Sequence, residues 1–190
     1  MFDYISDYSL SSLLNFSLTT LVISAITSAI IFIPWSFYKK SRHENITQLK
    51  TKVLFITYLI ALFIITIYRF GNTNEYADIN IIPFKLLIES YQYSVSDNPQ
   101  MALPVLLYNV IGNIIWFIPM GFFLAYFMKS NRFIRVCILC LLISVWIETI
   151  QYLLVVGISD IDDVIFNTIG GIIGFCIYQI AIKKGIINDH

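Results

Sequence analysis

Five long apolar blocks dominate this sequence and constrain its fold more than any other feature. They cover residues 13–38, 53–70, 103–128, 136–156 and 164–182. Each is close to the roughly 20 apolar residues that a helix needs to cross about 30 Å of hydrocarbon. Hydrophobic residues make up 58% of the chain and charged residues only 13%, and a soluble domain of this size cannot bury five such helices. We therefore predict an all-α polytopic membrane bundle, with five transmembrane helices in a single domain over residues 1–190.

Most basic residues lie on one predicted side of the membrane. The loops after the first, third and fifth blocks hold ten of the twelve Lys and Arg residues. Because positive residues favour the cytoplasmic side, we predict that these loops are cytoplasmic, with the N-terminus outside and the C-terminus inside. The first twelve residues carry no Lys or Arg, so we expect the first block to remain as a span rather than to be removed as a signal peptide.

The longest predicted outer connection, about 69–102, contains a proline followed by an apolar stretch. Pro83 cannot continue a preceding helix, whereas Phe84, Ile88 and Tyr91 give the next segment apolar surface that suits the membrane boundary. We predict a short interfacial or re-entrant helix around 84–93. A surface loop with ordinary hydrophobic anchors is the alternative.

A carboxylate, Glu148, interrupts the fourth apolar block. A charge at the centre of a bilayer costs roughly 2.5–3.5 kcal/mol or more, so intramembrane ionisable residues are functional candidates. Other polar side chains share its predicted depth near the outer face, and Asn109 and Asn113 lie four residues apart on one helix face. We predict an outward-facing ligand-binding pocket with these lining residues: Arg69, Asn109, Asn113, Glu148, Gln151, Asp160, Asp163 and Asn167. The alternative is that these residues only hydrogen bond between helices.

Glycines continue the polar stripe of the last block toward the inner side. Gly170, Gly171 and Gly174 follow Asp163 and Asn167 at helical spacing. Small residues let membrane helices approach closely, so we predict that these glycines serve helix packing. Packing of two copies of the chain through this stripe, as a homodimer, is the alternative.

Four short segments follow one another in a distinctive order and spacing. They occupy residues 80–84, 109–121, 148–151 and 160–170, and Arg69 lies upstream of the first. In this pattern the chain resembles the VanZ-like family of bacterial membrane proteins over about residues 69–174. The resemblance implies a multi-pass protein of the bacterial plasma membrane that is linked to teicoplanin resistance and the cell envelope. It implies no reaction mechanism.

One segment departs from that family's pattern. Its members often carry an arginine shortly before the Asp-Ile-Asp-Asp segment, whereas this chain reads Val-Val-Gly-Ile-Ser at 155–159. Arg69 or Lys85 would have to supply the positive charge there, which weakens the case for an anionic ligand at that position.

Two main functional hypotheses follow. The first is a non-enzymatic protein whose amides and carboxylates bind a lipoglycopeptide or a lipid-linked envelope precursor. The second is an intramembrane enzyme acting on a lipid-linked substrate, with Glu148 or Asp163 as general acid or base and Asp160 and Asp162 as ligands for a divalent cation. Acidic residues at a helix N-terminus are more simply explained as caps, so we favour the first hypothesis.

A transporter is disfavoured, because we see no inverted repeat and no polar path through the inner halves of the last three blocks. We expect membrane lipids as partners, and we expect no nucleic acid, no cofactor and no bound metal.

Overall fold

The computed structural model describes residues 18–20, 22–24, 26, 46–67, 77–97, 99–129, 132–156 and 158–187. The chain divides into two compact units, one formed by Ser11–Phe70 and the other by Met1–Leu10 with Gly71–His190. The smaller unit contains helix α2 (Ile46–Ile67). Most of the predicted first span, 13–38, lies outside the described residues, as does Arg69.

Four helices in the described part of the chain are long and apolar enough to cross a membrane. They are α2, α4 (Pro99–Met128), α5 (Phe133–Leu154) and α6 (Ile161–Lys183). Each overlaps one of the last four predicted blocks, so the chain is a largely helical, multi-pass membrane protein. The fifth span, the orientation of the termini and the single domain stay predictions.

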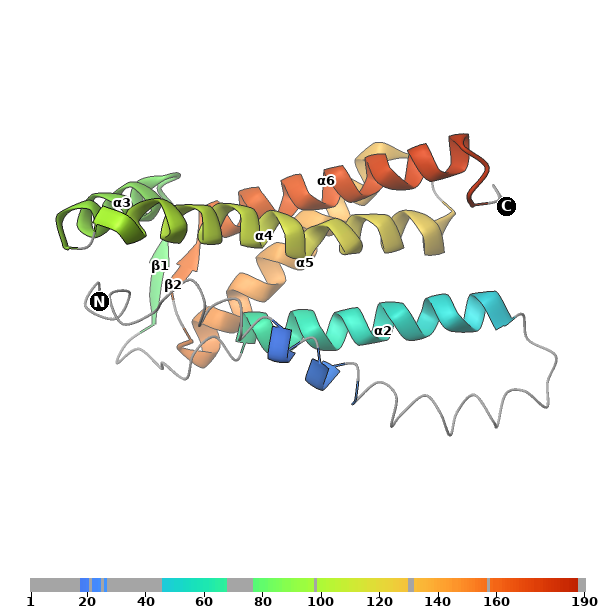
Figure 1. Cartoon of the computed structure of the whole chain (residues 1–190), viewed down its shortest axis with the longest axis horizontal. Helices are drawn as coiled ribbons and strands as arrows, with labels where there is room; N and C mark the ends of the chain where they lie inside the picture. The colour runs from blue at the N-terminus through green and yellow to red at the C-terminus, as the bar shows by residue number, and fades with distance from the viewer. Residues whose placement is uncertain are drawn as a thin grey trace. The chain divides into compact units, whose positions relative to one another are not determined.

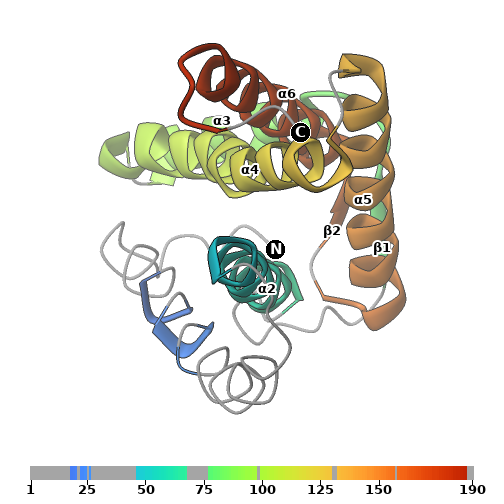
Figure 2. The same ribbon diagram turned by 90° about the vertical axis from the view of Figure 1, so that its right-hand side faces the viewer.

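In the larger unit, α6 runs alongside α4, and α5 crosses them at an angle (Figures 1 and 2). Glycines lie where α4 and α6 come closest. A Cβ atom added at Gly170 or Gly174 would overlap the backbone carbonyl oxygen of Ile114 or Ile118 in α4. A Cβ added at Gly121 would likewise overlap the carbonyl oxygen of Gly171. Only residues without a side chain permit this separation of the two backbones.

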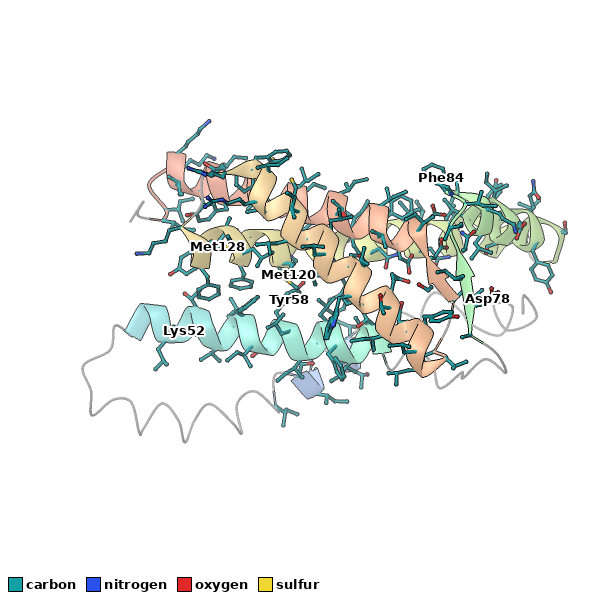
Figure 3. The ribbon with its side chains drawn as sticks, turned by 180° about the vertical axis from the view of Figure 1, so that it is seen from behind. Lys52, Tyr58, Asp78, Phe84, Met120 and Met128 are labelled. Carbon is teal, nitrogen blue, oxygen red and sulfur yellow. The ribbon has the colours of Figure 1, made fainter. Side chains whose placement is uncertain are left out.

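A short parallel strand pair, not predicted from the sequence, lies at one end of this unit. Strand β1 (Asp78–Asn80) pairs with β2 (Ile158–Asp160), and Asn80 lies opposite Asp160. Helix α3 (Lys85–Asp97) follows β1 and packs against α4. It extends four residues beyond the predicted 84–93 helix. Figure 3 shows Asp78 and Phe84 at this end of the unit and Met128 at the other end of α4.

The turn between α5 and α6 is defined by its two caps. Helix α5 ends at Leu154 and is capped by Val155, whose backbone is left-handed (φ 56°, ψ 38°) and whose N–H points back to the carbonyls of Gln151 and Tyr152. Helix α6 begins after Asp160, whose side chain accepts a hydrogen bond from the backbone N–H of Asp162 at 3.1 Å. This is the N-cap arrangement that acidic residues favour.

Candidate functional site

Asn80 ties the outer connection to the start of α6. Its side chain is only 8% exposed, and its Nδ2 donates to Asp160 Oδ1 at 2.8 Å and to the Ile82 carbonyl at 3.1 Å. Its Oδ1 accepts from the Ile82 N–H at 3.2 Å. The buried side-chain amide of Asn80 therefore stabilises the turn that follows it and links two segments that are 80 residues apart in the sequence.

Glu148 reaches the same place from α5. Its Oε2 accepts a hydrogen bond from the backbone N–H of Asp160 at 2.9 Å, and the residue is 5% exposed. Asp160 is thus the centre of the cluster, because it bonds Asn80 and Asp162 through its side chain and Glu148 through its backbone. We refer to Asn80, Glu148, Asp160 and Asp162 as the strand-end cluster.

Asp162 is the most deeply buried carboxylate of the cluster, at 2% exposed. Its Oδ1 accepts from the backbone N–H of Phe84 at 2.7 Å. Its Oδ2 is also buried and has no hydrogen-bond partner among the residues that the structure describes. Burying a carboxylate costs several kcal/mol, whereas one hydrogen bond to a charged group returns about 1.5–3 kcal/mol and the N-terminus of a helix about 0.3–1 kcal/mol. The interactions seen at Asp162 therefore leave part of that cost uncompensated.

Backbone strain lies on both sides of the cluster. Phe84 has φ 62° and Val155 has φ 56°, a region that bulky or β-branched residues rarely adopt. The N–H of Phe84 donates to Asp162, and Val155 lies where the chain leaves α5 toward β2. Strain of this kind often accompanies functional sites.

Two further side-chain hydrogen bonds connect the helices at positions further along α6 from the cluster. Asn113 Nδ2 in α4 donates to Asp163 Oδ1 in α6. Asn167 Nδ2 in α6 donates to the Ser144 hydroxyl oxygen in α5 at 2.9 Å, and both residues are buried. Hydrogen bonds of this kind hold membrane helices together.

The predicted lining residues therefore fall into different settings. Glu148 accepts a hydrogen bond from the backbone N–H of Asp160, and Asn113 donates one to the side chain of Asp163. The Nδ2 of Asn167 is directed to Ser144. Asn109 is half-buried in α4 and Gln151 is buried in α5.

Asn80, Asp162 and Ser144 were not among the lining residues predicted from the sequence. A signal for Ser144 was present, because it lies one helical turn before Glu148 on the same face. Asn80 gave no comparable signal, since its partner depends on the strand pairing. Within the described ranges, no group of three or more His, Cys, Asp and Glu side chains is placed to hold a metal ion.

An exposed apolar stripe begins beside the cluster and continues along α3. It consists of Phe84, the residue before α3, and of Ile88, Tyr91 and Val95, all exposed. The last three are spaced by three and four residues, which puts them on one helix face. Polar residues, including Lys85 and Gln92, occupy the adjoining exposed face. The remaining side of α3 packs on α4.

Comparison with known proteins gives two similarities. A model of the VanZ/LLP1 family matches residues 55–182. Protein VanZ of Enterococcus faecium is 38% identical over 82 residues, which are 43% of this chain and 47% of that protein. That alignment therefore covers less than half of either chain. No solved structure matches.

Proposed function

This chain belongs to the VanZ/LLP1 family, and from that premise we propose that it binds an amphipathic ligand at the outer leaflet of the bacterial plasma membrane. The ligand class is a teicoplanin-type lipoglycopeptide or a lipid-linked component of the cell envelope, and the role is linked to glycopeptide resistance. The observation that carries the proposal is the strand-end cluster, whose buried polar groups lie next to the exposed apolar stripe of α3. A polar site beside an exposed apolar surface suits a ligand that has both a polar and an apolar part.

The proposed orientation has five spans, the N-terminus outside and the C-terminus inside. Its support is the distribution of charge in the larger unit. Lys129 ends the α4 turn, Arg132 and Arg135 begin α5, and Lys183 and Lys184 end α6, so these five cations share the end opposite the strand-end cluster. With this end cytoplasmic, the cluster faces outward.

In that orientation α3 is the interfacial helix. Its apolar stripe would contact membrane lipids at the outer leaflet, and Lys85 and Gln92 would face water. Tyr91 suits this depth because its ring is apolar and its hydroxyl is polar. An amphipathic ligand would then reach the cluster along the membrane surface.

The proposed pocket keeps the lining residues given by the sequence. Those in the larger unit are Asn109, Asn113, Glu148, Gln151, Asp160, Asp163 and Asn167. Arg69 lies outside the described residues and stays a prediction from the sequence. The contacts that support it are those of Glu148 with Asp160 and of Asn113 with Asp163, because they gather three helices near one end of the unit. Gly170 and Gly174 pack against α4 of the same chain, so we assign that stripe to packing within one molecule.

Antibiotic susceptibility tests this function. A Gram-positive host would express wild type, Glu148→Gln or Asp163→Asn at matched membrane levels, and teicoplanin would be compared with vancomycin. We expect wild type to raise the minimal inhibitory concentration of teicoplanin selectively and both variants to lose that protection.

Asp78→Asn is the matched control. It removes one carboxylate from the same end of the larger unit, but Asp78 is exposed, and its side chain accepts a hydrogen bond from the backbone N–H of its own neighbour, Ile79. It should protect as wild type does. A well-expressed wild type that gives no protection, and whose purified form binds no teicoplanin, would contradict the proposal.

A further inference from the structure

We propose that Asp162, with Asp160 beside it, binds a primary ammonium group that carries an apolar chain. This inference deepens the proposed function and rests on it for its biological setting, since it names the chemical group that the outer cluster recognises. The observation behind it is the buried Oδ2 of Asp162, which has no hydrogen-bond partner among the described residues.

The charge of the site points to a cation. The hydrogen bonds that the two carboxylates accept come from the Asn80 side chain and from the backbone N–H groups of Asp162 and Phe84, all of which are neutral. Neither aspartate forms an ion pair within the described part of the chain. Two adjacent carboxylates with neutral donors leave negative charge that a bound cation would compensate.

The geometry favours a hydrogen-bond donor over a metal ion. Calcium takes six to eight oxygen ligands, and among the described residues no group of three acidic, histidine or cysteine side chains is placed to hold a metal ion. An ammonium group instead brings three N–H donors. One of them would meet the Asp162 Oδ2, whose partner oxygen is already held by Phe84.

The surroundings favour an apolar chain on the ammonium. Phe84 donates its N–H to Asp162, yet the residue as a whole is 45% exposed. The stripe continues from there to Ile88 and Tyr91. Because Asp162 Oδ2 is enclosed, the turn at residues 82–84 must shift to admit the group, and this turn already holds strain at Phe84.

Amines of graded methylation test the site. Hexylammonium and its N-methyl, N,N-dimethyl and N,N,N-trimethyl derivatives would be titrated into the purified full-length protein in detergent, with binding measured by calorimetry. All four carry the same charge and chain, but the number of N–H donors falls from three to none. We expect hexylammonium to bind at least about tenfold tighter than the trimethyl compound, as a charge-assisted hydrogen bond implies. Equal affinity across the series would overturn the proposal, and this result needs no variant protein.

Variants then locate the effect. Asp162→Asn should abolish the preference for the primary amine, whereas the exposed control Asp78→Asn should keep it. A preference that survives in a folded Asp162→Asn protein would also overturn the assignment. Thermal unfolding of each variant shows whether it is folded.

The same preparations separate this inference from the proposed function. A preference for primary ammonium that Asp162→Asn removes, together with no binding of teicoplanin, would support the site and contradict the proposed function. Binding of teicoplanin without any preference among the amines would support the function and overturn the site.

Discussion

Replacing Gly174 with alanine should destabilise the packing of α6 on α4. The added Cβ would overlap the carbonyl oxygen of Ile118 and would lie 2.8 Å from the backbone nitrogen of Phe122. Both atoms belong to the α4 backbone, so rotation of a side chain cannot relieve the contact, and the helices must move apart. Overpacking of this kind costs about 1–3 kcal/mol. We expect about 2–3 kcal/mol here because the obstructing atoms are backbone.

Gly112→Ala provides the matched control. This glycine lies in α4, and no described heavy atom outside its local helix backbone lies within 4 Å of an added Cβ. Alanine is favoured over glycine inside a helix by about 0.5–1 kcal/mol. The same chemical change should therefore be neutral or stabilising at 112 and destabilising at 174, with a separation of about 3 kcal/mol between the two variants.

The assay is reversible unfolding of the purified protein in mixed micelles. Helical circular dichroism would be followed as the mole fraction of sodium dodecyl sulfate increases, for wild type and both variants. We expect the midpoint of Gly174→Ala to fall and that of Gly112→Ala to stay or rise. Coincident curves for the two variants would refute the close approach of α4 and α6 as the reason for this glycine.

Three further predictions concern the polar and strained positions. Asn113→Asp should lower the unfolding midpoint, because it brings a second carboxylate against Asp163. Adding Asp163→Asn should recover much of the loss by restoring an amide–carboxylate pair, and no recovery would argue against this contact. Val155→Gly should stabilise the protein by about 1 kcal/mol in the same assay, because a left-handed backbone costs an L-residue about 1–2 kcal/mol, and a lower midpoint would contradict this. Asn80→Ala should speed amide exchange at Ile82 and Phe84 while leaving the centre of α4 protected. Unchanged exchange at these two amides would show that other contacts hold the turn.

The helices could be predicted from sequence because the length and apolarity of a span are local properties. The predicted block 136–156 and the observed α5 at Phe133–Leu154 differ by at most three residues at either end. The starts differ more: α2 begins at Ile46 rather than near 53, and α4 begins at Pro99 rather than near 103. Proline is well tolerated at the first position of a helix, where its missing N–H is not needed, so an apolar threshold alone places this start too late.

The contacts of the site could be predicted only in part, because a sequence shows which residues share a helix face but not which helix that face meets. Asp163 and Asn167 lie one turn apart on α6, yet Asp163 contacts Asn113 of α4 and Asn167 contacts Ser144 of α5. The pairing of β1 with β2 was harder still to predict from the sequence. Each strand has three residues, too few to show an alternating pattern, and their register is set by side chains such as Asn80.

The two variants in the susceptibility experiment report on different contacts, which makes their comparison informative. Glu148 bonds the backbone of Asp160, and β2 in turn pairs with β1, which leads into α3. Its replacement by glutamine therefore perturbs the position of the outer connection. Asp163 bonds Asn113 and joins α6 to α4. If Glu148→Gln alone abolished protection, the strand-end cluster and α3 would be the functional surface, and the contact between Asn113 and Asp163 would be reduced to helix packing.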